Sequence, residues 1–290
     1  MKKPHRNTIF VENAEILSHE AYDAGQYIMR VHAPKCAEHA QAGSFAHIQC
    51  DLQLAMRRPI SIMRTSKNSG WVDFLYKIEG NGTRLLATRQ AGEKISILGP
   101  IGNPFVPHMK RRRPLLIGGG VGIPPMIFLA DKLREIENAY HPLVLMGSEV
   151  PFPFEVTPSS IPVNGIDTDI NASMPLLEGW NIPSRLASLK DFTGTHKGYV
   201  TGLARTWLDN LSEEQRDEVE IFACGPHPML EAVAKLAKDF NLPCQVSLEE
   251  FMACAVGGCA GCVVEVQTPD GPAMKRVCVD GPVFDATTVF

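Results

Sequence analysis

Four cysteines near the C-terminus have the residue type and the spacing to hold a metal centre. Cys254, Cys259, Cys262 and Cys278 follow the pattern C-x4-C-x2-C, with the fourth cysteine after fifteen intervening residues. This is the plant-type spacing of a [2Fe-2S] cluster, in which four thiolates surround two irons. The loop 253–262 consists of small residues, which lets a backbone wrap closely around an inorganic core and direct N–H groups at its sulfurs. The pattern predicts an electron-transfer protein.

A structural zinc site is the alternative, because paired cysteines also bind zinc. Zinc sites usually place two C-x2-C pairs symmetrically along the chain, whereas the spacing here is asymmetric and rich in glycine. The pattern therefore favours the iron–sulfur cluster over zinc.

Two further segments suit a dinucleotide. Gly118-Gly119-Gly120-Val121-Gly122 follows a short apolar run and precedes a predicted helix, which is the context of a phosphate-binding loop. The segment does not match the dinucleotide-binding motif G-x-G-x-x-G, because residue 123 is Ile. A tight turn that binds no ligand is the alternative, since it would need the same glycines. Cys224-Gly225-Pro226 ends another predicted strand, at the sheet edge where ligands bind. A buried, unreactive Cys224 is the alternative there.

A fourth segment, Arg58-Pro59-Ile60-Ser61, opens a predicted strand. The forked donors of an arginine suit a diphosphate, and a serine hydroxyl can hydrogen-bond a ring or a phosphate. The pattern is short enough to occur by chance, and an edge strand that starts at proline beside a solvated arginine would look the same.

These residues must be positioned by two kinds of structure. The first hundred residues contain short apolar or alternating segments separated by Gly, Pro, Asn and Ser, which predicts an antiparallel β-barrel. From residue 109 onward, strand and helix patterns alternate, which predicts a doubly wound parallel sheet. The predicted strands and helices are Thr8–Ile16, Gln26–His32, Ile60–Arg64, Val72–Ile78, Lys94–Leu98, Leu115–Ile117, a helix from Ile123 to about Asn138, Leu143–Met146, Glu218–Ala223 and a helix over Pro226–Phe240.

The segment 151–183 is rich in Pro, Asn and Ser and allows no assignment of elements. The predicted domains are a barrel at residues 1–108, an α/β domain at 109–243 and a cysteine-bearing module at 244–290. The module is too short to be stable without its metal.

Composition narrows the function classes. The 290 residues are 44% hydrophobic with a net charge of −4, which gives no support for nucleic-acid binding. No apolar run suits a signal peptide or a membrane span, and eight cysteines are too few for a disulfide scaffold. A reducing cytoplasm is the expected compartment. Cys36, Cys50 and Cys244 receive no role beyond buried thiols.

In combination, these motifs resemble the ferredoxin–NAD(P)H reductase superfamily. The stretch from Met252 to Cys262, with Cys278 to Phe284, is similar to the electron-transfer subunit of class 1B dihydroorotate dehydrogenase. The resemblance covers essentially the whole chain, which is longer than typical members chiefly between Pro151 and Thr195.

The resemblance implies an FAD-binding barrel, an NAD(H)-binding α/β domain and a [2Fe-2S] module. It also implies a partner, an FMN-containing dihydroorotate dehydrogenase catalytic subunit in pyrimidine biosynthesis, with two of each subunit forming a heterotetramer. The implied cofactor-binding residues are Arg58, Pro59, Ile60, Ser61, Leu75, Tyr76, Lys77, Gly82 and Thr83 for the flavin, and Gly118, Gly119, Gly120, Val121, Gly122, Cys224, Gly225 and Pro226 for the nicotinamide dinucleotide. The implied cluster ligands are Cys254, Cys259, Cys262 and Cys278.

No catalytic acid or base is expected, because hydride transfer and single-electron steps need none. NAD(H) is favoured over NADP(H), since Gly147–Pro153 after the second α/β strand carries no basic residue for a 2′-phosphate. Two other functions remain open. One is an NAD(P)H reductase for ferredoxin or a sulfur compound, alone or in another complex. The other is an iron–sulfur redox sensor, which the flavin motif and the glycine loop disfavour.

Overall fold

The computed structural model describes residues 8–136 and 139–290. The chain forms two compact units, each made of two separate segments. The first unit combines the chain up to Pro104 with Glu249–Val283, and the second combines Phe105–Leu248 with Phe284–Phe290. The predicted boundaries 1–108, 109–243 and 244–290 stay a prediction.

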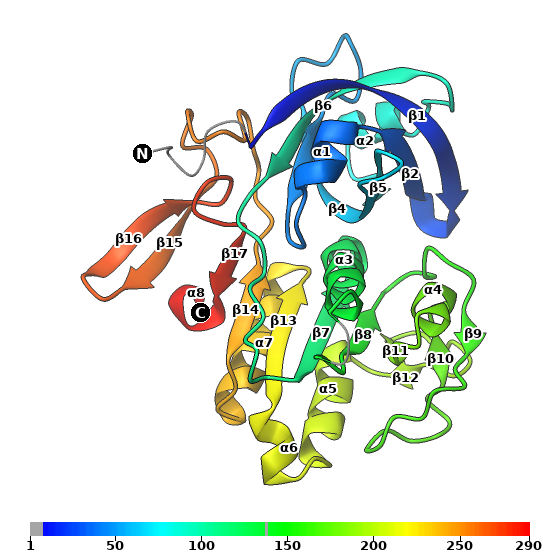
Figure 1. The fold of residues 1–290 in the computed structure, drawn as a ribbon, viewed down its shortest axis with the longest axis vertical. Coiled ribbons are helices and arrows are strands. Elements are labelled where there is room, and N and C mark those ends of the chain that lie inside the picture. The colour runs from blue at the N-terminus through cyan, green and yellow to red at the C-terminus, as the bar shows by residue number, and fades with distance from the viewer. Residues whose placement is uncertain (1–7, 137–138) are drawn as a thin grey trace. The chain divides into compact units, whose positions relative to one another are not determined.

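The first unit contains a closed six-stranded antiparallel barrel, as predicted (Figure 1). Its strands follow the order β1-β2-β5-β4-β3-β6. Two short helices, α1 (Pro34–His39) and α2 (Asn81–Leu86), lie between strands. The strands are β1 (Phe10–Tyr22), β2 (Gln26–His32), β3 (Phe45–Ile48), β4 (Arg58–Ser66), β5 (Trp71–Lys77) and β6 (Lys94–Ile101).

Two barrel strands differ most from the sequence-based prediction, and β4 and β6 also extend beyond their predicted ends. β1 continues past the predicted end at Ile16 to Tyr22, because its second half pairs with β2 after a register shift between Ile16 and Ser18. β3 was not predicted. All four of its residues are buried, so it lacks the alternation of apolar and polar residues that identifies a strand exposed on one side.

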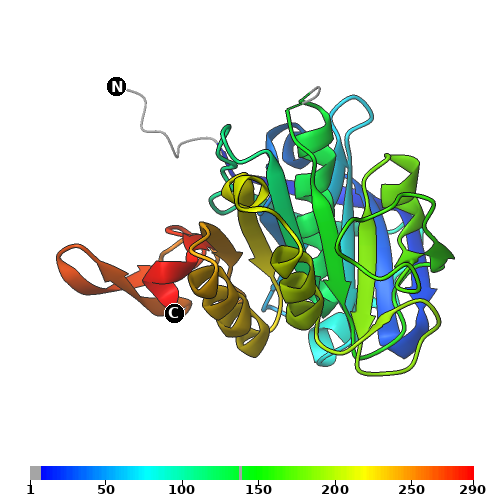
Figure 2. The ribbon, with the colours of Figure 1, turned by 90° about the horizontal axis from the view of Figure 1, so that it is seen from below.

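The second unit contains a seven-stranded, mostly parallel sheet, in the order β12-β11-β8-β7-β13-β14-β17. From β7 to β8 the chain moves toward one edge of the sheet, and from β13 to β14 it moves toward the other. Right-handed crossovers therefore place α3 on one face and α7, with its neighbour α5, on the opposite face (Figure 2). The prediction of a doubly wound sheet is confirmed. Its strands are β7 (Arg113–Gly119), β8 (Leu143–Gly147), β11 (Ser184–Ser188), β12 (His196–Lys197), β13 (Val219–Cys224), β14 (Cys244–Ser247) and β17 (Val283–Asp285).

The helices of this unit are α3 (Ile123–Arg134), α4 (Pro175–Gly179), α5 (Val200–Asp209), α6 (Glu213–Asp217), α7 (His227–Asp239) and α8 (Ala286–Val289). α3 ends before its predicted end, and the predicted residue Asn138 lies outside the described residues. The segment without assigned elements holds a small pair of strands, β9 (Thr157–Pro158) and β10 (Ala172–Ser173), as well as α4. No helix in the described part of the chain has the length and apolarity to cross a membrane.

The cysteine-bearing segment of the first unit is mostly irregular, with one hairpin formed by β15 (Val263–Thr268) and β16 (Gly271–Arg276). Its C-terminal end is attached to the barrel through Asn103. The Asn103 amide side chain donates to the Asp280 carbonyl at 2.8 Å, and its backbone N–H donates to the Gly281 carbonyl at 2.7 Å. The segment is therefore anchored beside the end of β6.

A buried acid fixes the start of the second unit. Glu220 on β13 is fully buried and accepts three hydrogen bonds. The backbone N–H of His108 donates at 2.9 Å, the His108 ring Nδ1 lies at 2.8 Å, and the Gln245 side-chain amide donates at 2.9 Å. Gln245 also bonds the backbone of Val106 in both directions. These bonds hold the chain before β7 against the sheet.

Replacing Glu220 with glutamine is expected to destabilise the second unit by about 2 kcal/mol, because the new amide nitrogen cannot accept from the donors around it. Chemical unfolding followed by circular dichroism measures this loss. Glu218→Gln is the matched control. Its ion pair with Arg113 at 3.1 Å is partly exposed, so its loss should cost no more than about 1 kcal/mol. Equal effects from both variants would contradict the assignment.

Candidate redox site

The four predicted cluster ligands come together as two pairs of thiols in the first unit. The Cys262 and Cys278 sulfurs are 3.3 Å apart and buried. Cys254 and Cys259 form the more exposed pair, in which the Cys259 backbone N–H donates to the Cys254 sulfur at 3.4 Å. Cys262 and Cys278 are held near each other because the Val277 N–H bonds the Cys262 carbonyl at 2.9 Å.

This arrangement fits a binuclear cluster. Within the described ranges, no three His, Cys, Asp or Glu side chains gather as they would around a single ion. A structural zinc ion needs four such donors at one point. A [2Fe-2S] cluster distributes four thiolates over two irons, so two separate pairs are what it requires. The donor set is therefore suited to the cluster.

The loop backbone favours the thiolate form of Cys254. N–H groups of Val256, Cys259 and Gly258 lower the pKa of Cys254 to about 6, despite some burial. Positive φ at Ala255, Gly257 and Ala260 turns these amides inward. Burial, together with the adjacent Cys262, raises the pKa of Cys278 to about 12. Cys278 is thus protonated without metal, and iron binding must displace its proton.

Arg276 connects the cluster loop to its hairpin. Its guanidinium donates to the Gly257 carbonyl at 3.1 Å, and its backbone N–H donates to the Asp280 carboxylate at 2.8 Å. Gly257 has a φ of +80°, and a β-carbon there would also collide with Val279. The loop turn between the first two cysteines therefore requires glycine at this position.

In the barrel, the structure brings Arg58 and Gly82 together. A β-carbon on Gly82 would lie 2.7 Å from the Arg58 Nε, so the guanidinium crosses directly over the first turn of α2. The Thr83 hydroxyl accepts from the N–H groups of Glu79 and Gly80 and stabilises the same turn. Arg58 and Gly82 are far apart in sequence but lie against each other here, and we call this pair the Arg58–Gly82 cradle; its role in binding a diphosphate stays a prediction.

The predicted strand Leu75-Tyr76-Lys77 does not present all three side chains to one face. Neighbouring residues of a strand point in opposite directions. The Tyr76 ring stacks on Tyr27 at a centroid distance of 5.4 Å, and its hydroxyl lies 2.7 Å from His19 Nε2. Leu75 and Lys77 share the other face. A single bound ligand can therefore contact the side chains of Leu75 and Lys77, or that of Tyr76, but not all three.

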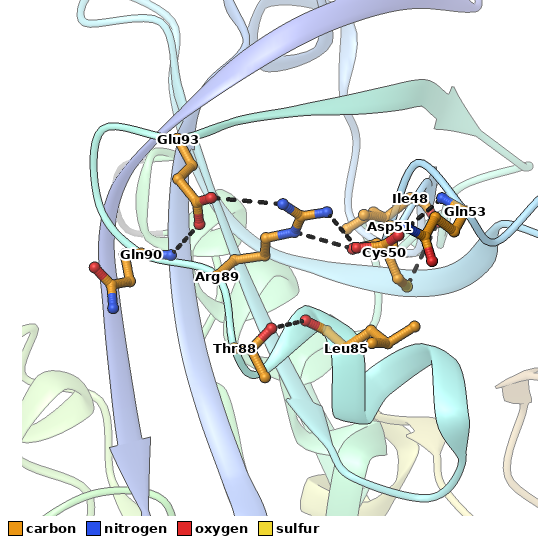
Figure 3. Close-up of polar contacts among 9 residues, drawn as sticks. All are labelled: Ile48, Cys50, Asp51, Gln53, Leu85, Thr88, Arg89, Gln90 and Glu93. Atoms are coloured by element: carbon orange, nitrogen blue, oxygen red, sulfur yellow. Dashed lines mark hydrogen bonds and ion pairs between the residues drawn. The ribbon is translucent and has the colours of Figure 1, made fainter.

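Arg89, after α2, holds the loop that precedes the Arg58 motif (Figure 3). Its guanidinium donates to the Asp51 carboxylate at 2.7 Å and to the Cys50 carbonyl at 3.2 Å, and reaches Glu93 at 3.5 Å. Its carbonyl lies 2.8 Å from His19 Nδ1. His19 lies on β1 and its ring also contacts Tyr76 on β5, so the network connects the loop before the Arg58 motif with these two strands.

Replacing Gly82 with alanine is expected to displace the Arg58 guanidinium while leaving the fold intact, because the colliding group is a flexible side chain. Loss of one charge-assisted hydrogen bond to a diphosphate would weaken FAD binding by about 1.5–3 kcal/mol, measured by fluorescence titration of the apoprotein. Gly80→Ala is the control, because a β-carbon at Gly80 meets nothing within 4 Å. Unchanged affinity in Gly82→Ala would show that Arg58 does not bind the diphosphate.

In the second unit, the glycine loop and Cys224-Gly225-Pro226 lie side by side. Gly118 pairs with Cys224 across β7 and β13. A β-carbon on Gly122 would collide with the Cys224 carbonyl, and one on Gly119 would collide with Met229. The two predicted segments therefore form one surface at the C-terminal edge of the sheet, where ligands bind in such folds.

The helix that follows offers few N–H donors. Pro124 and Pro125 have none, and the Ile123 N–H is bonded to the Gly120 carbonyl. A bound dinucleotide would instead approach the backbone of Gly120, which has a φ of +55° and open space within 4 Å of a β-carbon. The phosphate-binding role predicted for the helix N-terminus therefore depends on its dipole rather than on free donors.

Comparison with known proteins decides the family. Residues 249–290 match the iron-sulfur cluster binding domain of dihydroorotate dehydrogenase B. The chain is 33% identical to the "Dihydroorotate dehydrogenase B (NAD(+)), electron transfer subunit" of Caldanaerobacter subterraneus subsp. tengcongensis, over 85% of this chain and 86% of the relative. It is 32% identical to the subunit of the same name from Bacillus cereus (strain G9842), over 96% of each. The chain belongs to the family of dihydroorotate dehydrogenase B electron transfer subunits.

Solved structures agree on the fold. An NADH-dependent reduced ferredoxin-NADP oxidoreductase superposes with a TM-score of 0.76 at 23% identity, covering 96% of this chain and 90% of the other. The ferredoxin reductase in carbazole 1,9a-dioxygenase gives 0.62 at 20% identity, over 81% and 67%. At such identities the likeness concerns the fold alone.

Sequence reasoning missed several residues that position the site in this electron transfer subunit. Arg57, next to the predicted Arg58, donates to the His47 carbonyl at 3.1 Å and to the Ser96 carbonyl at 2.8 Å. The sequence shows two adjacent arginines, but it does not show that the Arg57 side chain bonds β3 and β6 whereas the Arg58 side chain lies over α2. Arg89 and His19 gave no signal, because their partners are distant in the chain.

Proposed function

We propose that this chain moves electrons between NAD(H) and an FMN-containing dihydroorotate dehydrogenase catalytic subunit. FAD would bind against the barrel and a [2Fe-2S] cluster would bind at the four cysteines. The observation that carries the proposal is that the two thiol pairs and the Arg58–Gly82 cradle belong to one compact unit. The names of the relatives, which are electron transfer subunits of an NAD(+)-dependent enzyme, support the partner and the nucleotide.

When bound, flavin accepts a hydride from nicotinamide and releases electrons singly, and the cluster carries one electron at a time. The side chains of this protein bind and orient. Arg58 would neutralise the diphosphate across the α2 turn, and the backbone at Gly119–Gly122 would let the nicotinamide dinucleotide approach the sheet edge. Amides of the cluster loop would donate to the thiolates of the exposed pair. No side chain needs to act as an acid or base.

The choice of NAD(H) over NADP(H) is part of the proposal. The segment after β8 is neutral or acidic, which supports NAD(H). The neighbouring strands add two exposed cations, Lys190 after β11 and Lys197 on β12. Turnover of NADH and NADPH with an artificial acceptor measures the preference. Faster turnover of NADPH would overturn this part.

The whole proposal is tested by anaerobic NADH titration of the purified chain, followed by visible absorbance and electron paramagnetic resonance. The expected result is flavin bleaching with a [2Fe-2S] signal, and coupling of NADH to dihydroorotate only after the catalytic subunit is added. Reduction of both groups without that coupling would indicate another acceptor. An inert chain would refute the proposal.

A further inference from the structure

Residues 51–56 form a loop with exposed apolar side chains directly before the flavin motif. Leu52 is 86% exposed and Met56 is 46% exposed, and Leu54 between them is partly exposed. Single exposed apolar side chains are common on protein surfaces, so exposure alone indicates no function. This loop differs because hydrogen bonds fix its backbone at both ends while its apolar side chains stay in solvent.

Asp51 fixes the first end of the 51–56 loop. Its carboxylate accepts from the Arg89 guanidinium at 2.7 Å and from the backbone N–H of Gln53 at 2.8 Å (Figure 3). Its carbonyl accepts from the Leu54 N–H at 3.2 Å, which closes a tight turn. An aspartate that bonds the N–H two residues ahead commonly starts such a turn. Leu52 therefore lies in a turn of defined shape, with its side chain in solvent.

Arg58 fixes the other end of the loop. Its Nη1 donates to the Met56 carbonyl at 2.9 Å and to the Arg57 carbonyl at 3.1 Å. The same guanidinium crosses over Gly82 in the first turn of α2, so one side chain joins the loop to the Arg58–Gly82 cradle. Leu52 is four residues from Met56, and its backbone therefore lies within about 14 Å of Met56 even in an extended chain.

The direction of the chain indicates which half of an FAD molecule would meet the loop. β4 begins at Arg58 and runs toward Ser61, the residue of the flavin motif that suits a flavin ring. The 51–56 loop reaches Arg58 from the other side. An extended FAD with its diphosphate at Arg58 and its flavin along β4 therefore has its adenosine half beside the loop. Adenine has two flat faces, which aliphatic side chains cover in ligand sites.

We propose that Leu52 and Met56 cover the adenine ring of bound FAD and thereby select FAD over FMN, which lacks the adenosine monophosphate half. This inference rests on the proposed function, because it assigns the second half of the same flavin site. The hydrogen bonds of Asp51 and Arg58 hold the loop before the ligand arrives, so binding requires little further ordering of the loop. Selection matters in the proposed complex, since its other subunit contains FMN.

Pulsed hydroxyl-radical footprinting tests the contact without any substitution. The full chain with its cluster is freed of flavin and then saturated with FAD or with FMN, and mass spectrometry follows the oxidation of Leu52 and Met56. FAD should protect both side chains, and FMN should protect neither. Met109 is the internal control, because it is 68% exposed and belongs to the second unit. Its oxidation should be the same with either flavin.

Leu52→Ser measures how much the contact contributes to affinity. We expect FAD binding to weaken about tenfold in a fluorescence titration, equivalent to about 1.4 kcal/mol, and FMN binding to stay unchanged. Leu52→Met keeps an apolar side chain and should bind both flavins like wild type. Val11→Ser is the matched control, because Val11 is 67% exposed on β1, outside the loop. It should leave the affinity for FAD unchanged.

Two results would overturn the proposal. One is oxidation of Leu52 and Met56 that is as fast with FAD as with FMN. The other is a loss of affinity in Leu52→Ser that is equal for both flavins. A wild-type chain that bound no flavin would refute the proposed function itself. Flavin that binds and is reduced by NADH while the loop stays unprotected would refute the adenine contact alone.

Discussion

Replacing Cys278 with serine is expected to abolish the iron–sulfur cluster. Cys278 is the one ligand outside the loop, and it shares a buried site with Cys262, 3.3 Å away. A serine hydroxyl has a much higher pKa than a thiol and is a harder ligand, so one iron would lose half of its protein ligands. Iron and sulfide per chain should fall close to zero, and the visible and paramagnetic signals of the cluster should disappear.

Losing the metal should also loosen the segment that binds it. Few of the residues 249–283 are fully buried, so the segment has little core of its own. Limited proteolysis should cut Cys278→Ser there faster than wild type. Cys244→Ala is the control, because Cys244 is a buried thiol on β14 outside the predicted ligand set, and it should retain a full cluster. Full iron content in Cys278→Ser would remove Cys278 from the ligand set.

The second large effect is expected for Gly122→Ala. A β-carbon at this position would overlap the carbonyl of Cys224 and the backbone of Gly225. Backbone atoms of a central strand cannot move aside as a side chain can, so the glycine loop must withdraw from β13. The φ of Gly122 is −84°, which alanine adopts freely, and the effect is therefore purely steric. We expect a loss of about 3 kcal/mol in stability and weaker NADH binding.

Thermal unfolding and NADH titration of the variant measure the two consequences separately. Gly179→Ala is the matched control, since a β-carbon at the end of α4 meets nothing within 4 Å. It should unfold like wild type and bind NADH normally. Gly122→Ala with wild-type stability and affinity would mean that the loop does not need its close approach to Cys224.

The chemistry of the site was predictable where the signal is local. The C-x4-C-x2-C loop places three predicted ligands within nine residues, and the glycines of 118–122 follow a short apolar run, which indicates a strand leading into a turn. Long strands and helices with clear periodicity, such as α7, were predicted for the same reason. These features depend on neighbours in the chain.

The residues that escaped prediction depend on distant partners. β3 has four buried residues without alternation, and β14 looks like part of the cysteine module because nothing in sequence shows that it pairs with β13. In sequence, Glu220 is only a polar residue that interrupts an apolar strand. Its role depends on His108 and Gln245, which are distant in the chain and bond its carboxylate.

The order of segments along the chain determines how cleavage of the backbone can divide the protein. The polypeptide leaves the second unit after Leu248, adds Glu249–Val283 to the first, and returns to the second for its last residues. β17 completes the sheet edge next to β14, and α8 packs on β14. A single cleavage of the backbone therefore releases neither unit as an intact piece. A nick beside Phe251 would leave both fragments held by non-covalent contacts, to be separated only by denaturant.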